Sequence, residues 1–281
     1  MQADGQDTPA DGAVDVSVPS VARMYDYYLD GKDNYEVDRA AVAELDKVVP
    51  STKPLAINNR RFLRRVVRVL SEEFGIRQFL DHGSVLPTQD NVHQIAQRAD
   101  PDARVVYVDN DPIVLAHGRA LLQENERTAV IQADMRDTDV IFEHPETRRL
   151  LDLSQPVAAL FVSVMHCIPD RGEGESGEDA GPAGLVRRVA ERLPSGSFLV
   201  VNQLVSEDKA TRDFVTGFME ETTHGNWGRV RRAHEVERYF DGLEVLEPGL
   251  GEINDWRPDA EQGPPQLTGE WYEFGGVARK P

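Results

Sequence analysis

Residues 78–109 read QFLDHGSVLPTQDNVHQIAQRADPDARVVYVD. The stretch starts with a short apolar run that ends in an aspartate, and a turn containing Gly83 and Pro87 follows. A helical pattern then covers residues 91–99, and a β-branched run covers residues 104–109. A strand, a helix and a second strand at this spacing predict a parallel βαβ unit with a right-handed crossover.

The same alternation continues toward the C-terminus. The sequence predicts further strands at residues 128–134, 157–164, 197–203, 243–248 and 271–279, and helices at residues 112–122, 147–153, 185–193, 208–218 and 229–240. Together with the first two strands this makes seven. The alternation favours an α/β fold with a mostly parallel seven-stranded sheet and helices on both of its faces.

The N-terminal quarter of the chain has a different character. Residues 1–17 are polar without periodicity, which predicts a disordered tail. Residues 18–75 contain helical patterns interrupted by glycine and proline, the longest of them over residues 57–74. We therefore expect a helical cap at residues 18–75, followed by an α/β core at residues 76–281.

Composition narrows the class of protein. The chain has 281 residues, of which 40% are hydrophobic and 28% charged, as in ordinary globular proteins. It contains no apolar run long enough for a membrane span, and its N-terminus does not resemble a secretory signal. Cys167 is the single cysteine, which excludes an internal disulfide and a cysteine zinc cluster. We expect a cytoplasmic protein without a membrane partner.

The charge pattern disfavours nucleic acid as a partner. A formal net charge of −18 repels phosphate backbones. One basic stripe, formed by arginines at positions 60, 61, 64, 65 and 68, is interpreted as the solvated face of a single helix. The seven histidines show no ligand spacing, so the sequence predicts no metal site.

Three aspartates mark a candidate binding site. Asp81, Asp109 and Asp134 each end one of the first three predicted strands. Ligands bind beyond the carboxyl ends of parallel strands, so we expect these side chains to lie along one rim. Asp109, with Asn110 beside it, could accept hydrogen bonds from ribose hydroxyls, and Asp134, followed by Met135, could accept one from an adenine amine. An aspartate at a strand end is also a common turn or capping residue, and that alternative remains open.

The turn after the first strand helps to select the cofactor. Dinucleotide sites use a G-x-G-x-x-G turn, but here only Gly83 is present and Val85 stands where a second glycine would be. The chain also has no nucleotide-triphosphate loop of the G-x-x-x-x-G-K-[ST] type. S-adenosylmethionine has no phosphate and demands less of this loop, so it is favoured over NAD.

Several stretches resemble a known family. These are ARMYDYYLDGKDNYEVDR, INNRRFLRRVVRVL, FLDHGSVLPTQDNVHQIAQ, ARVVYVDNDPIVLAHGRALL, ADMRD and GLEVLEPGLGEINDWRPD. In this combination, from about Val18 onward, the chain is similar to a bacterial family of S-adenosyl methyltransferases within the class I superfamily. The resemblance implies a Rossmann-like fold, a helical N-terminal cap and S-adenosylmethionine as cofactor.

The resemblance also implies roles for particular residues. The glycine-rich turn of the wider class corresponds to Gly83, Ser84 and Pro87, the ribose-binding acid to Asp109, and the adenine-side acid to Asp134. Two positions depart from the family's pattern. His82 stands where a small apolar residue is usual, and Val85 replaces the second glycine.

Further candidates come from neighbouring segments. The polar loop at residues 30–35 could close over the cofactor, with Lys32 or the preceding Tyr28 touching it, and Arg60 could hold its methionine carboxylate. Ser163 lies at the end of the fourth strand. His166 follows it as a candidate general base, with a pKa suited to neutral pH. The alternatives are a solvated loop, a salt bridge for Arg60, and a histidine bonded within the cleft wall.

Two functions remain open at this stage. The first is methyl transfer to a small-molecule acceptor, which needs alignment more than fixed catalytic groups. The second is a non-catalytic protein that binds S-adenosylmethionine with the same fold. The sequence does not identify the acceptor or the oligomeric state.

Overall fold

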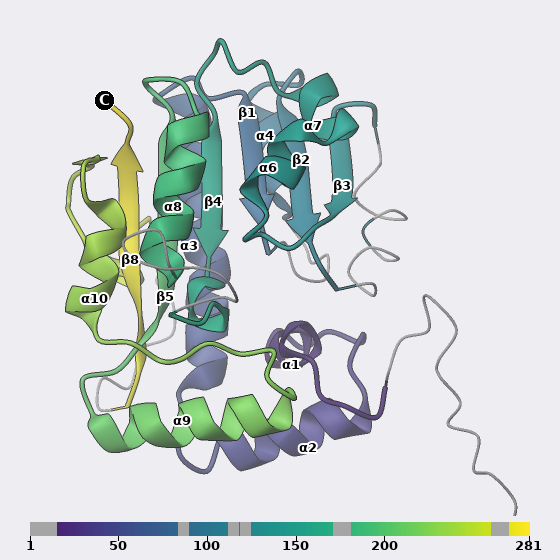
Figure 1. The fold of residues 1–281 in the computed structure, drawn as a ribbon, viewed down its shortest axis with the longest axis vertical. Coiled ribbons are helices and arrows are strands. Elements are labelled where there is room, and N and C mark those ends of the chain that lie inside the picture. The colour runs from purple at the N-terminus through teal and green to yellow at the C-terminus, as the bar shows by residue number, and fades with distance from the viewer. Residues whose placement is uncertain (1–15, 84–89, 112–117, 119–124, 171–180, 260–269) are drawn as a thin grey trace, which may run out of the picture.

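The computed structural model describes residues 16–83, 90–111, 118, 125–170, 181–259 and 270–281. Its centre is one eight-stranded sheet (Figure 1). The strands are β1 (Gln78–His82), β2 (Arg104–Asp109), β3 (Thr128–Gln132), β4 (Ala158–Val162), β5 (Phe198–Val205), β6 (Glu244–Val245), β7 (Gly251–Glu252) and β8 (Tyr272–Arg279).

The sheet is mostly parallel, as expected. Its order is β3-β2-β1-β4-β5-β8-β6, and β7 pairs with β8 outside this path. β1 to β5 run parallel, whereas β8 is antiparallel to β5, β6 and β7. The expected count of seven strands is wrong because β7 is only two residues long, too short for a periodicity to reveal it.

Helices flank the sheet and extend beyond it. They are α1 (Val21–Tyr28), α2 (Glu36–Leu45), α3 (Thr52–Glu72), α4 (Val92–Ala99), α6 (Thr138–Glu143), α7 (Pro145–Leu150), α8 (Gly181–Arg192), α9 (Lys209–Thr222) and α10 (Ala233–Glu237), with short 3₁₀ turns η1 (Met165–Cys167), η3 (Arg238–Phe240) and η4 (Ile253–Asp255). The helix expected at residues 112–122 lies outside the described residues apart from Gly118, and so does the expected tail up to residue 15.

Two helix predictions need correction. The helix expected at residues 147–153 is α7, which begins earlier, at Pro145, because His144 caps it by accepting from the Glu146 backbone N–H, and which ends at Leu150. The preceding helix α6 was not predicted. The helix expected from Arg229 starts only at Ala233. The preceding segment is extended, and Arg231 forms a parallel bridge to Val205 of β5.

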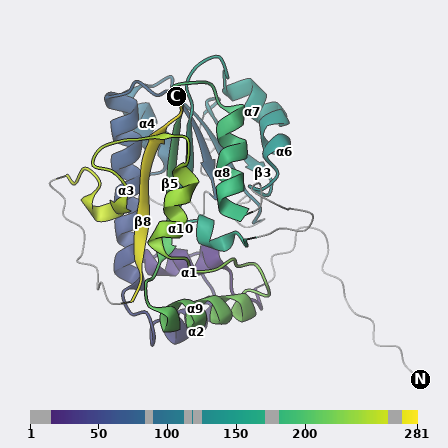
Figure 2. The same ribbon diagram turned by 60° about the vertical axis from the view of Figure 1, so that its left-hand side comes forward.

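The two faces of the sheet carry separate apolar cores. Figure 2 shows α3 and α4 on one side of the sheet and α6, α7 and α8 on the other. On the first side Phe62 and Val66 of α3 pack with Phe79 of β1. On the second, Phe161 of β4 packs with helix residues such as Leu185 of α8. All five are 0% exposed, as expected for strands covered on both faces.

A third apolar cluster joins the N-terminal helices to α9. Met24 of α1, Leu45 of α2 and Leu55 of α3 pack with Met219 of α9 and with Trp271. In Figure 1, α1, α2 and α9 lie beyond the carboxyl ends of the parallel strands. The second half of α3 packs against the sheet itself, so the proposed boundary at residue 75 stays a prediction.

The arginine stripe of α3 is not uniformly solvated. Arg65 is 4% exposed, and its guanidinium donates to the carbonyl oxygens of Ile253 (2.7 Å) and Trp256 (3.2 Å). Arg68, one turn later, is exposed and forms a 3.6 Å ion pair with Asp259. The expectation of a solvated face is therefore wrong at Arg65, because the C-terminal segment around η4 covers that part of α3.

We expect Arg65→Ala to lower the free energy of unfolding by about 2–4 kcal/mol, because it leaves two buried carbonyls without their charged donor. Arg68→Ala is the matched control and should cost less than about 1 kcal/mol, as exposed ion pairs do. Urea denaturation of both variants measures the difference. Equal losses for the two would contradict the structural role of Arg65.

Candidate functional site

A cavity of about 800 Å³ lies where the carboxyl ends of the parallel strands face the N-terminal helices. Residues of α1, α3 and α9 line it, together with the residues that follow β1 to β4. We refer to it as the cap cavity. Its volume falls within the range of roughly 300–1,000 Å³ typical of small-molecule and cofactor sites.

The three aspartates selected from the sequence all line the cap cavity. Asp81 lies in β1, Asp109 ends β2, and Asp134 follows β3 by two residues. β1 pairs in parallel with β2, and β2 with β3, so the three strand ends meet at one edge of the sheet. The convergence that we expected is present in the structure.

Asp81 is the most buried of the three, at 5% exposure. Burial raises the pKa of Asp81 to about 7, an effect that the positive charge of Arg60 opposes and the negative charge of Asp109 reinforces. Asp109 is half-buried, and its Oδ1 accepts a 2.9 Å hydrogen bond from the backbone N–H of Asp111. Asp109 also lines the cap cavity.

Asp134 has a different environment. Burial tends to raise the pKa of its carboxyl, but hydrogen bonds from the side chain and backbone of Arg136 outweigh this and lower it. Arg136 Nε lies 2.9 Å from Oδ1 and 3.1 Å from Oδ2, so both oxygens already have a donor. An adenine amine at this position must share Asp134 with Arg136.

Gly83 shapes the turn after β1. Its φ is +70°, and a Cβ at this position would lie 2.5 Å from Cγ1 of Val164. Its N–H donates to the carbonyl of Val108 in β2 at 2.8 Å, which holds the turn against the neighbouring strand. Glycine is therefore required here for both backbone and space. Ser84 and Pro87, and with them Val85, lie outside the described residues.

Most other predicted residues also reach the cap cavity. Its lining includes Tyr28, Arg60, Asn110, Met135 and Ser163. Tyr28 is 4% exposed, and its hydroxyl donates to Asp46 at 2.9 Å. Arg60 donates to the carbonyl of Asp90 at 3.3 Å.

Lys32 and His82 lie elsewhere. Lys32 is exposed and does not line the cap cavity. His82 is fully buried and its ring stacks on Phe161 with the centroids 4.2 Å apart. The histidine that departs from the family's pattern therefore packs against Phe161 of β4 and does not line the cap cavity.

His166 lines the cap cavity, but its pKa is not tuned to neutrality. Burial and, to a lesser extent, the nearby charge of Arg231 lower the pKa of His166 to about 3. Nδ1 of His166 accepts the backbone N–H of Leu204 at 3.3 Å, which places the proton of the neutral ring on Nε2. The expectation of a general base suited to neutral pH is wrong here, and the alternative of a histidine bonded within the cleft wall describes the ring better.

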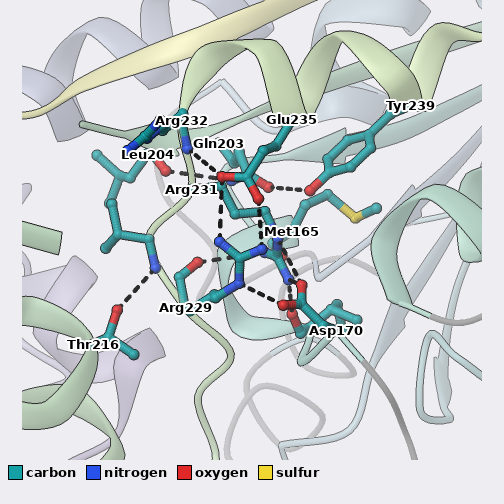
Figure 3. A network of polar contacts seen from close by, with 12 residues as sticks. Met165, Asp170, Gln203, Leu204, Thr216, Arg229, Arg231, Arg232, Glu235 and Tyr239 are labelled. Atoms are coloured by element: carbon teal, nitrogen blue, oxygen red, sulfur yellow. Dashed lines mark hydrogen bonds and ion pairs between the residues drawn. The ribbon is translucent and has the colours of Figure 1, made fainter. Parts of the chain in front are cut away.

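A charged cluster fixes the segment that carries His166 (Figure 3). Arg231, 2% exposed, donates to the carbonyls of Met165 (3.1 Å) and Ile168 (2.8 Å) at the two ends of η1. Asp170 pairs with Arg231 and with Arg229, and Arg229 also pairs with Glu235. These charges pair with one another, and the bonds from Arg231 hold both ends of η1 in place.

A buried polar network that was not predicted from the sequence lies in the wall of the same cavity. Glu273 of β8 is 2% exposed, lines the cap cavity, and accepts hydrogen bonds from Ser163 and Asn202. Asn202 also donates to Asn59 of α3 at 3.0 Å, and Asn59 donates to Tyr25 of α1 at 2.8 Å. A lone glutamate within the apolar run WYEFGGVA was the signal that could have revealed it.

Two kinds of feature are not found among the described residues. None of its helices has both the length and the apolar character needed to cross a membrane. Within the same residues, no group of three or more His, Cys, Asp or Glu side chains is arranged to hold a metal ion.

Comparison with known proteins identifies a matching family and similar solved structures. Residues 7–281 match the model of a family described as S-adenosyl methyltransferase. A provisionally named methyltransferase from Thermobifida fusca YX is 41% identical, with a TM-score of 0.84 over 95% of this chain and 96% of that one. A DUF574 family protein from Streptomyces avermitilis is 38% identical, with a TM-score of 0.83 over 96% and 100%. No curated protein matches the chain.

The raised pKa of Asp81 predicts a pH-dependent stability. The folded protein keeps this proton up to about pH 7, whereas the unfolded chain releases it near the ordinary value of 3.8. Between these two values the folded state binds more protons, so wild-type stability falls as the pH rises.

Asp81→Asn removes the pH-dependent contribution of this carboxyl group to the free energy of unfolding. Relative to wild type, we expect the variant to gain about 1–3 kcal/mol in unfolding free energy between pH 5 and pH 8. The measurement is denaturant unfolding at both pH values, with the exposed Asp102→Asn as control. A difference that does not change with pH would show that Asp81 is ionised in the folded protein at pH 5.

Proposed function

Because the chain belongs to the S-adenosyl methyltransferase family, we propose that its cap cavity binds S-adenosylmethionine and that the protein transfers the methyl group to a small-molecule acceptor. The observation that carries this proposal is the convergence of Asp81, Asp109 and Asp134 on one cavity of cofactor size. When bound, the cofactor supplies a methyl group on a positively charged sulfur. The residues of the chain have only to hold, orient and shield the reacting groups.

Asp109 is the proposed ribose ligand. It ends β2 at the carboxyl edge of the sheet. Nucleotide-binding α/β folds use a carboxylate in this place to accept hydrogen bonds from the ribose hydroxyls. One of its oxygens bonds to Asp111, an arrangement that holds the carboxylate in position. Met135 and Asp134 follow the next strand and would flank the adenine.

Asp81 and Arg60 fit the amino-acid part of the cofactor. Both line the cap cavity, and they are close enough for Arg60 to affect the pKa of Asp81. The methionine moiety carries an ammonium and a carboxylate. A buried carboxylate beside an arginine presents the complementary pair of charges, and a bound ammonium would stabilise the ionised form of Asp81.

The position of the helices supports a small acceptor. α1, α3 and α9 all contribute to the lining, so the reacting groups are surrounded by protein and shielded from water. The net charge of −18 disfavours a nucleic-acid acceptor. Binding without transfer is the alternative, and turnover of the cofactor in the presence of an acceptor separates the two.

We expect Asp109→Ala to weaken the binding of S-adenosylmethionine and S-adenosylhomocysteine by about 1–3 kcal/mol, roughly 5- to 150-fold, because charged hydrogen bonds to the ribose are lost. Titration calorimetry measures both affinities. Asp102→Ala, in the turn that precedes β2, is the control and should bind like wild type. Wild-type affinity in Asp109→Ala would refute the ribose role, and a wild-type protein that binds neither compound would refute the proposed function.

A further inference from the structure

Glu273 is a buried carboxyl group in the wall of the cap cavity. It lies in β8 opposite Leu204 of β5, and its strand neighbour Phe274 belongs to the apolar core. The side chain is nevertheless in the lining of the cavity. Burying a carboxylate costs free energy unless its charge is compensated, so its presence in a strand that is paired on both sides calls for an explanation.

The groups that bond to Glu273 are uncharged. Ser163 Oγ donates to Oε1, and Asn202 Nδ2 donates to Oε2 at 2.8 Å. Ser163 itself has a φ of +57°, an unusual value for a residue other than glycine, and its N–H donates to the carbonyl of Asn202 at 3.0 Å. Strain of this kind gathers at functional sites, and here it directs the serine hydroxyl at the carboxyl group.

The network continues to the cap. Asn202 and Asn59 are both buried, and Asn59 donates to the hydroxyl of Tyr25, which in turn donates to the carbonyl of Ala56 at 3.2 Å. The chain of bonds thus links β8, β5, α3 and α1. It holds the carboxyl group of Glu273 in one orientation without neutralising its charge.

The wall near this network is aromatic. Trp227 and Trp271 line the same cavity and are 6% and 2% exposed. Within the described part of the chain, neither indole N–H has a hydrogen-bond partner. The ring of His166 packs against Trp227 with the centroids 4.9 Å apart. Such a wall favours an apolar ring with a polar substituent.

We propose that Glu273 binds the acceptor of the methyl group and takes its proton, and that the acceptor is an apolar ring compound bearing a hydroxyl or amino group. This inference rests on the proposed function. As the bond between sulfur and methyl breaks and the bond between methyl and acceptor forms, the acceptor's proton passes to the Glu273 carboxylate. The methylated product and S-adenosylhomocysteine then leave, and water that replaces them takes up the proton from Glu273.

The pKa of Glu273 agrees with its role as a proton acceptor. Burial raises the pKa of Glu273 to about 7, and the bonds from Ser163 and Asn202 only partly offset the rise. Among the described residues, the charge of Glu273 affects the pKa values of Tyr25 and Cys167. Burial raises both values to about 12, so these groups stay neutral at physiological pH. Of these three groups, Glu273 is therefore the one that changes charge near neutrality, and its carboxylate form increases as the pH rises. Asp81, which lines the same cavity, also has a pKa of about 7 in the unliganded protein, so the test uses protein saturated with S-adenosylhomocysteine, whose ammonium keeps Asp81 ionised in the proposed arrangement.

The test uses Glu273→Gln in the full chain saturated with S-adenosylhomocysteine. Three matched probes, toluene, benzyl alcohol and benzylamine, differ only in the group attached to the ring. We expect wild type to bind benzyl alcohol or benzylamine at least tenfold more tightly than toluene, and the variant to lose this preference. Glu252→Gln, in β7 and outside the cavity lining, is the control and should keep it.

A pH series separates a carboxylate from a merely structural residue. Benzylamine stays protonated between pH 5.5 and pH 8, so its affinity for wild type should rise at least threefold over this range as Glu273 ionises. The affinity for Glu273→Gln should not change with pH. With tritiated S-adenosylmethionine, transfer to the tighter-binding probe should be at least tenfold slower in the variant than in wild type.

Each failure has its own meaning. If wild type does not bind S-adenosylhomocysteine, the proposed function is wrong. If it does, and Glu273→Gln keeps that affinity within threefold but shows the wild-type probe preference, the role of Glu273 is overturned. Equal binding of the three probes, binding of none, or transfer that is absent from wild type or equal in both proteins, also overturns it.

Discussion

Parallel pairing of β1 with β2 and β4 is the constraint on which the site depends. It brings the carboxyl ends of neighbouring strands to one edge of the sheet, and each strand there ends in or is followed by a polar residue. Strands covered on both faces can be apolar up to that edge and polar only beyond it. The carboxylates of Asp81, Asp109 and Asp134 therefore converge although they are far apart in the chain.

The antiparallel return of β8 adds a second set of groups to the same cavity. Glu273 arrives from the C-terminal end of the chain, and Asn202 of β5 bonds to it. In the proposed arrangement the rim formed by β1, β2 and β3 holds the methyl donor. The network of β5 and β8 faces the acceptor, and the apolar cluster of α1, α2 and α9 covers both.

The alternation of apolar strands and helices in the sequence was enough to predict the parallel core. It also predicted the three aspartates, because each aspartate lies at or just beyond the end of a recognisable strand. Long-range contacts were not predictable in this way. The bonds of Arg65 to carbonyls near η4, and those of Glu273 to Ser163 and Asn202, join segments about 70–190 positions apart. The lowered pKa of His166 depends on burial and on Arg231, which no spacing in the sequence reveals.

The most direct measurement of this account is a crystal structure of the protein with S-adenosylhomocysteine. We expect the ribose hydroxyls within hydrogen-bond distance of Asp109, the amino-acid end between Asp81 and Arg60, and the sulfur directed toward the part of the cavity that contains Glu273. A nucleoside bound elsewhere, or one oriented with its sulfur away from Glu273, would contradict it.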